Sequence, residues 1–104
     1  RNIAGIAYQY EVERNFTRAV KVYTLAHDLT AISSSLYWLN LAEIYSTPDY
    51  TNKDYNKAVE YFKKVIDDPE AEAVHKDNAK TNIKGICSIQ KPTICLGLDP
   101  KYLQ

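Results

Sequence analysis

The residues whose type and spacing most directly suggest chemistry are two cysteines. Cys87 and Cys95 are eight positions apart, and eight residues across a helix end can bring two Cβ atoms within bridging range. The pair can form a disulfide, or both side chains can stay as buried thiols in a reducing compartment. A tetrahedral metal site would need further ligands. Because no histidine stands near the cysteines, we predict no metal site.

The histidines and serines show no catalytic pattern. His27 and His75 have neither an HExxH partner nor a cysteine at catalytic spacing. The serines at 33–35 lack the glycine-flanked turn that exposes the nucleophile of hydrolases, and they are better placed to cap a helix. The chain also has no glycine-rich phosphate loop. The sequence therefore predicts no enzyme activity and no cofactor.

The charge balance restricts the kinds of partner. The 104 residues include 13 basic and 13 acidic side chains, so the formal net charge is zero and no field would attract nucleic acid. No apolar run approaches the roughly 20 residues of a membrane helix, so we predict no membrane insertion. Because the chain has no methionine, we expect a piece of a longer or processed protein. A cytoplasmic location is favoured, unless bridged cysteines indicate a secretory or periplasmic one.

Helices are the elements that must position these residues. Apolar side chains recur at three- and four-residue steps, which predicts helices, and no β alternation persists over five residues. Helices after the first have capping residues at their starts: Asn15, a serine at 33–35, Thr51 with Asp54, and Asp68 before Pro69. After Gln90 the pattern ends, and we expect an irregular tail that packs through Leu96, Leu98 and Leu103.

The size pattern of the first apolar stripe recurs further along the chain. Four positions repeat at an offset of 35: Ile3 with Trp38, Ile6 with Leu41, Ala7 with Ala42, and Tyr10 with Tyr45. Three positions of the next helix repeat at an offset of 39: Ala19 with Ala58, Tyr23 with Phe62, and Ala26 with Val65. Antiparallel helices need small residues where their axes come closest, and the paired alanines supply them. The pattern therefore predicts helix hairpins that stack on one another.

This pattern resembles the tetratricopeptide repeat superfamily. The first helix of that family's repeat has a large residue, then Leu, a small residue and Tyr, and these are matched by Trp38, Leu41, Ala42 and Tyr45. The second helix has Ala, an aromatic residue and Ala, and a Pro closes the repeat. These positions are matched by Ala58, Phe62 and Pro69, with Val65 replacing the last Ala. The long turn and "KDYNKAVEYFKKV" (53–65) look more like the SEL-like branch, some of whose secreted bacterial members carry cysteine pairs at this spacing.

The resemblance covers about residues 2–69 and implies an all-α fold. The expected fold is a short right-handed α-solenoid of about five helices in a single domain, 1–104. Repeat one would span about 2–30 and repeat two about 34–68. A third partial repeat or capping helix would span about 69–90, and the irregular tail 91–104.

In the resembling family, the first helices of the repeats line a concave groove that binds a partner. Carried over to this chain, the groove residues are Tyr8, Glu11, Leu36, Leu39, Asn40, Glu43, Lys80 and Lys84. Tyr8 and Leu39 would be exposed hydrophobic anchors. The resemblance thus implies a protein-interaction scaffold that binds a protein or peptide segment. The alternative is a structural segment of a larger superhelix or oligomer, whose neighbours are further repeats of the same chain or another copy.

Overall fold

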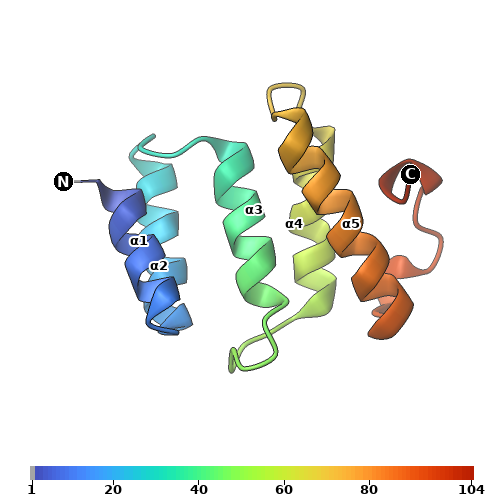
Figure 1. Ribbon diagram of the computed structural model, residues 1–104, viewed down its shortest axis with the longest axis horizontal. Helices are drawn as coiled ribbons and strands as arrows, with labels where there is room; N and C mark the ends of the chain where they lie inside the picture. Colours follow the sequence, from blue (N-terminus) through green and yellow to red (C-terminus); the bar gives the residue numbers. More distant parts are fainter. Residues whose placement is uncertain (1) are drawn as a thin grey trace.

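Residues 2–104 are described by the computed structural model, and their regular structure is entirely helical (Figure 1). Five α-helices follow one another: α1 (Ile3–Val12), α2 (Phe16–Asp28), α3 (Ser34–Tyr45), α4 (Tyr55–Asp67) and α5 (Ala73–Ile89). Two short 3-10 turns complete the tail: η1 (Thr93–Cys95) and η2 (Pro100–Tyr102). The predicted all-α fold with five helices is confirmed over this range.

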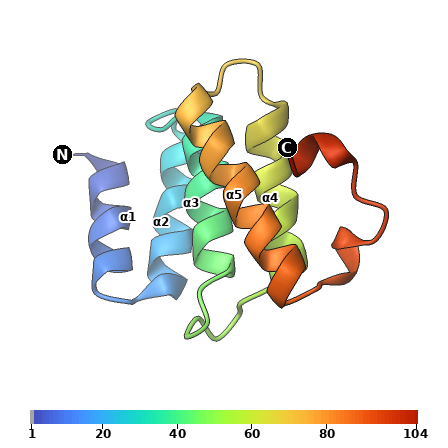
Figure 2. The same ribbon diagram turned by 45° about the vertical axis from the view of Figure 1, so that its right-hand side comes forward.

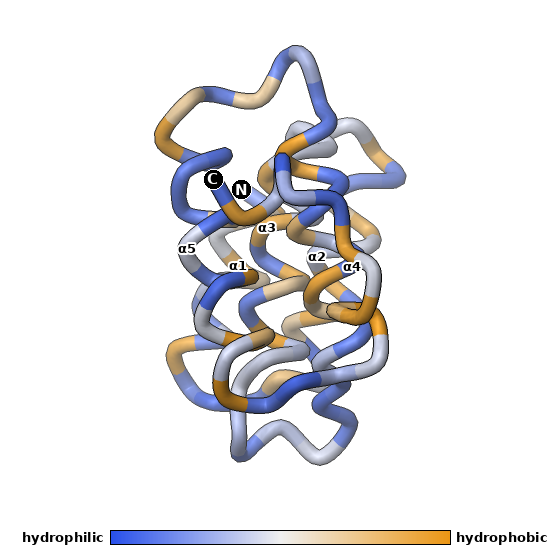
Figure 3. The backbone as a smooth tube through the Cα atoms, turned by 90° about the vertical axis from the view of Figure 1, so that its right-hand side faces the viewer, coloured by the Kyte–Doolittle hydropathy of each residue, from blue (hydrophilic) through white to orange (hydrophobic). Residues whose placement is uncertain are grey.

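The helices form two layers. α1, α3 and α5 make one row, and α2 and α4 lie behind it (Figures 1 and 2). Each helix packs against the next one in the sequence, and α3 also contacts α5. The Cα extents of 41 × 31 × 18 Å agree with an array two helices deep. Apolar residues recur at intervals along the helices (Figure 3), so each helix can bury one side against its neighbours.

Alanines lie where the helices of each hairpin meet. α1 packs against α2, and α3 packs against α4. The alanines of these contacts have no exposed surface: Ala7, Ala19, Ala42 and Ala58. A larger side chain at such a position would push the two helix axes apart. Their burial agrees with the size pattern seen in the sequence.

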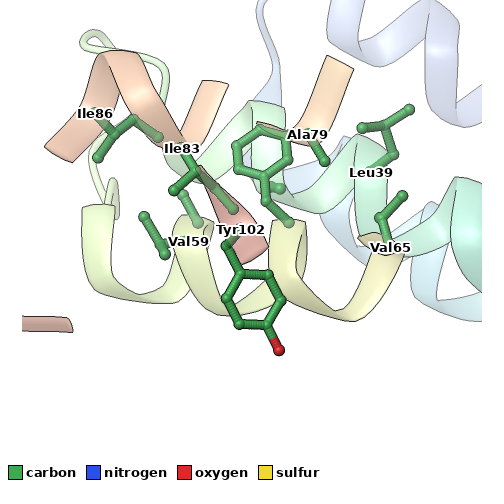
Figure 4. Packing of buried hydrophobic residues seen from close by; sticks show 10 residues of the cluster. Leu39, Val59, Val65, Ala79, Ile83, Ile86 and Tyr102 are labelled. Atoms are coloured by element: carbon green, nitrogen blue, oxygen red, sulfur yellow. The ribbon is translucent and has the colours of Figure 1, made fainter. Parts of the chain in front are cut away.

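α3 is the centre of the array because it is buried on two opposite sides. Leu41 and Ile44 belong to an apolar cluster shared with α1 and α2. Leu39 and Ala42 belong to a second cluster, shared with α4 and α5 and shown in Figure 4. A helix that is apolar all round is expected to be covered on more than one side. α3 therefore joins the first hairpin to the rest of the molecule.

Four of the five α-helix starts follow local capping chemistry, including that of α1, where the Asn2 side chain accepts from the Ala4 N–H at 3.0 Å. Asn15 and Ser33 accept hydrogen bonds from the N–H groups of Arg18 and Leu36, each at 3.3 Å, and so cap α2 and α3 as predicted. The cap of α4 is Asp54, whose carboxylate accepts from the Lys57 N–H at 3.0 Å. The expectation that Thr51 occupies the cap position is therefore wrong.

Asp68 and Pro69 do not begin the fifth helix. The Asp68 carboxylate accepts from the Glu70 N–H at 2.9 Å, and its backbone carbonyl accepts from Ala71 at 3.1 Å. The residue before a proline is pushed towards extended backbone, and Asp68 has ψ 113°. The segment therefore forms a turn, and α5 begins only at Ala73.

The tail is fixed along α4 at the end of the array opposite α1 (Figures 1 and 2). Asn56, near the start of α4, accepts from the Ile94 N–H at 2.9 Å. Near the other end of α4, the buried Tyr102 donates to Asp67 at 2.6 Å. Leu96, in contrast, is 81% exposed and so does not pack as expected.

The other two leucines of the tail differ from each other in exposure. Leu98 is half-buried against the apolar cluster of α4 and α5, whereas Leu103 is exposed. The inward position of the tail is held by Tyr102 instead, because its ring packs in that cluster while its hydroxyl reaches Asp67. An aromatic side chain with a polar tip suits such a site.

Cys87 and Cys95 form a disulfide, with their Cα atoms 5.7 Å apart. It joins the last turns of α5 to η1. The tail is therefore held to α5 by a covalent bond and to α4 by hydrogen bonds that Ile94 and Tyr102 donate to Asn56 and Asp67.

Ala42→Leu should destabilise the fold by about 1–3 kcal/mol, because extra carbon atoms at a fully packed position force the helices apart. Urea unfolding followed by circular dichroism measures the change. Ala73→Leu, at an exposed position in the first turn of α5, is the control and should change stability by less than about 0.5 kcal/mol. Equal effects of both changes would contradict the close-contact role of Ala42.

Cys87→Ala combined with Cys95→Ala should lower the free energy of unfolding by about 2 kcal/mol, as expected for a short closed loop. Urea unfolding under oxidising conditions measures this loss. A dithiol reductant should lower the stability of the wild-type chain to a similar extent and leave the double variant unchanged. A reductant effect on the double variant would show that the loss does not come from this bridge.

Candidate partner-binding face

The predicted groove residues all lie on the row formed by α1, α3 and α5 (Figure 1). Tyr8 is 61% exposed and Lys84 is exposed. Five others are half-buried: Glu11, Leu36, Asn40, Glu43 and Lys80. We refer to these seven residues together as the front face. It combines one exposed aromatic ring with polar and charged side chains from three helices.

Leu39 does not belong to the front face. Its side chain is only 5% exposed and lies in the cluster that includes Ala79 and Ile83 of α5 (Figure 4). The expectation of an exposed hydrophobic anchor is therefore wrong. The physical reason is the contact between α3 and α5, which covers the side of α3 next to its contact with α4. Of the two expected anchors, only Tyr8 is exposed.

A hydrogen bond links the front face to the core beneath it. The Tyr23 ring of α2 is buried, and its hydroxyl donates to Glu11 Oε1 at 2.8 Å. Burial, and then this hydrogen bond, raise the pKa of the Tyr23 phenol well above its ordinary value. The bond therefore holds the Glu11 carboxylate in place on α1.

Glu43 of α3 lies close enough to Glu11 for the two charges to interact. Burial first, and then the negative charge of Glu11, raise the pKa of the Glu43 carboxyl group. The two ion pairs found in residues 2–104 are Arg14–Asp49 and Lys101–Asp67, so neither involves a residue of the front face. The α1–α3 part of this face is thus acidic, while α5 contributes Lys80 and Lys84.

A hollow of about 550 Å³ adjoins the front face at Leu36. It lies between the start of α3 and the turn that leads into α5, and its charged lining residues are Asp68, Glu70, Glu72 and His75. From the sequence, Asp68 was expected only as the cap of a helix. The acidic run "DDPEAE" (67–72) was the signal that could have linked these lining residues to the face.

A second hollow, of about 540 Å³, lies over α3 and α4 and is lined by aromatic and basic side chains. Lys64 lies over the Trp38 ring, with its Nζ atom 5.5 Å from the ring centroid. Tyr37 and Tyr61 also line it. No sequence argument placed these residues in a site. The α4 residues of this hollow lie in "YNKAVEYFKK" (55–64), where aromatic residues and lysines stand close together, whereas Tyr37 and Trp38 come from α3.

The other chemically notable side chains have structural partners. His27 Nε2 and Ser34 Oγ are 2.9 Å apart, and the His27 ring stacks on Tyr37 with centroids 4.3 Å apart. These contacts join the end of α2 to the start of α3. Within residues 2–104, no group of three or more His, Cys, Asp or Glu side chains could hold a metal ion. No helix in that range is long and apolar enough to cross a membrane.

Comparisons with protein families, with curated proteins and with solved structures found no match to this chain.

Glu43→Gln should stabilise the fold at pH 7. The pKa of Glu43 is raised in the folded state, so the folded chain keeps this proton to a higher pH than the unfolded chain. Stability is therefore lost as the pH rises above the ordinary carboxyl pKa, about 4.3. Urea unfolding at pH 7 and at about pH 3 should show a gain from the substitution only at pH 7. A gain at pH 3 alone would contradict the burial of this carboxyl group.

Proposed function

We propose that this chain is a non-enzymatic protein-interaction scaffold, and that its front face binds an extended or helical segment of another protein. The observation that carries the proposal is Tyr8, an aromatic side chain 61% exposed on the row of α1, α3 and α5. Aromatic residues are frequent anchors of protein interfaces. Because half-buried Glu11 and Glu43 lie on the same face, the ring has charged neighbours that can orient a partner.

We further propose that the hairpins form a short right-handed solenoid of the tetratricopeptide type. Three observations support this part: the size pattern at offsets of 35 and 39, the buried alanines of both hairpins, and the burial of α3 on two sides. Stacked hairpins present their first helices side by side, and this arrangement makes an extended binding surface.

The charges of the front face specify the chemistry of the partner. Glu11 and Glu43 favour a basic side chain over α1 and α3, whereas Lys80 and Lys84 favour an acidic one over α5. An apolar residue of the partner would pack on Tyr8. Such charge placement mainly sets direction and specificity, while the buried aromatic contact supplies most of the affinity.

The alternative function is structural. The side of α1 that carries Ile6 and Tyr10 favours it, because both side chains are only half-buried and line a hollow. In that reading the helices extend a larger superhelix or oligomer. The two functions use different sides of α1, so they can be tested separately.

The test is peptide selection from a displayed library on the folded chain, followed by calorimetric measurement of Kd. Tyr8→Ala should weaken the selected peptides at least about tenfold. Leu25→Ala is the matched control, since Leu25 is 49% exposed but lies on α2 in the other layer. Equal weakening by both changes, or by neither, would contradict binding at the front face.

A further inference from the structure

The hollow of about 540 Å³ over α3 and α4 is lined by aromatic side chains that keep part of their surface exposed. These are Tyr37 and Trp38 of α3 and Tyr61 of α4, and each of the three is half-buried. The volume is in the range of ligand-binding sites. We call this hollow, with its lining residues, the aromatic hollow.

The aromatic hollow and the front face lie on different sides of α3. The front-face residues of α3 are Leu36, Asn40 and Glu43, which follow one another at three- and four-residue steps and so share one side of the helix. Each residue turns an α-helix by about 100°, so Tyr37 and Trp38 point away from Leu36. A partner in the hollow would therefore contact other residues than a partner on the front face.

Two lysines of α4 give the aromatic hollow its positive charge. Lys57 and Lys64 are exposed lining residues, and the Nζ atom of Lys64 lies 5.5 Å from the Trp38 ring centroid. A ring attracts such a cation without neutralising it. Within residues 2–104 neither lysine belongs to an ion pair, and Glu60 is the acidic residue of the lining. With two cations to one anion, the hollow is complementary to an acidic partner.

The spacing of the two lysines favours one backbone conformation of the partner. Lys57 and Lys64 are seven residues apart, which is about 10.5 Å along the helix and nearly two full turns. In a polyproline II helix, side chains three residues apart share one side and are separated by about 9.3 Å. Side chains on one face of an extended strand are about 6.6 Å or 13 Å apart, so they match the lysines less closely.

Asn56 supplies the aromatic hollow with a hydrogen-bond donor. It lines the hollow, and its Oδ1 atom accepts from the Thr93 hydroxyl at 3.2 Å and from the Ile94 N–H at 2.9 Å. The amide oxygen is thus committed to the tail, and the NH₂ group of the same side chain can donate to a partner. Backbone carbonyls of a polyproline II helix make no internal hydrogen bonds, so they can accept from this group.

We propose that the aromatic hollow binds an acidic, proline-rich segment of another protein in the polyproline II conformation. Two acidic side chains three residues apart pair with Lys57 and Lys64, and proline rings pack on Trp38 and Tyr61. Grooves lined by aromatic residues suit such segments, because the polyproline II helix is ordered before it binds and loses little conformational entropy. Since the site shares no lining residue with the front face, it adds a second binding surface to the proposed scaffold.

Fluorescence titration of the folded chain tests the proposal, because Trp38 is its only tryptophan. A synthetic proline peptide with two glutamates three residues apart should give a saturable change with a Kd below about 1 mM. The same peptide with glutamines should bind at least about tenfold more weakly, since it lacks the charges. A peptide that keeps the glutamates but has glycines for prolines should bind similarly weakly, since its backbone is not ordered in advance.

Lys57→Gln combined with Lys64→Gln should raise the Kd of the acidic proline peptide about tenfold, whereas Glu60→Gln should lower it about twofold. All three side chains are exposed, so circular dichroism should show unchanged helix content. Lys21→Gln combined with Lys84→Gln is the matched control, since it removes the same charge from exposed positions outside the hollow. It should change the Kd by less than about twofold, because distant charges are screened.

Tyr8→Ala should leave the Kd of this peptide unchanged, which separates the aromatic hollow from the front face. Absence of a saturable signal up to about 1 mM, or equal weakening by the two double lysine variants, would overturn the proposal. Equal binding of the glutamine or the glycine peptide would do the same. Tighter binding of oligothymidylate would also overturn it, because a site for polyanions and stacked bases would then explain the lysines and rings.

Discussion

The burial of α3 on two opposite sides is the constraint on which the rest of the structure depends. Leu41 and Ile44 join it to the first hairpin, while Leu39 and Ala42 join it to α4 and α5. Because both contacts use one short helix, neither half can shift without uncovering apolar surface of the other. Fully buried alanines set how closely the helices approach.

The same constraint decides what α3 can offer to a partner. With its apolar residues committed to both flanks, the front face keeps only half-buried Leu36, Asn40 and Glu43. The exposed aromatic ring comes instead from α1, which has one packed neighbour fewer. A carboxyl group at such a half-covered position is costly to ionise, and a basic side chain of a partner would offset that cost.

Periodicity and capping chemistry were enough to predict five helices, the cap Asn15 and a cap among the serines at 33–35, because both signals are local. The wrong predictions concern residues whose exposure is determined by contacts between segments that are distant in the sequence. The pattern shows that Leu39 is apolar, but not that α5 covers it. Nothing in the spacing of Tyr102 indicates that a hydrogen bond to Asp67 would hold it against α4. The sequence predicted which helices contribute residues to the front face, but not how far each side chain is exposed.

The two ends of the array differ in how their apolar side chains are buried. Burying the apolar side chains of a hairpin flank against a neighbour is favourable in proportion to the area covered. At one end the tail supplies that cover with a single aromatic residue, a disulfide and hydrogen bonds, without a sixth helix. At the other end, Ile6 and Tyr10 of α1 are only half-buried. Within residues 2–104, the end with the tail is therefore the better covered of the two.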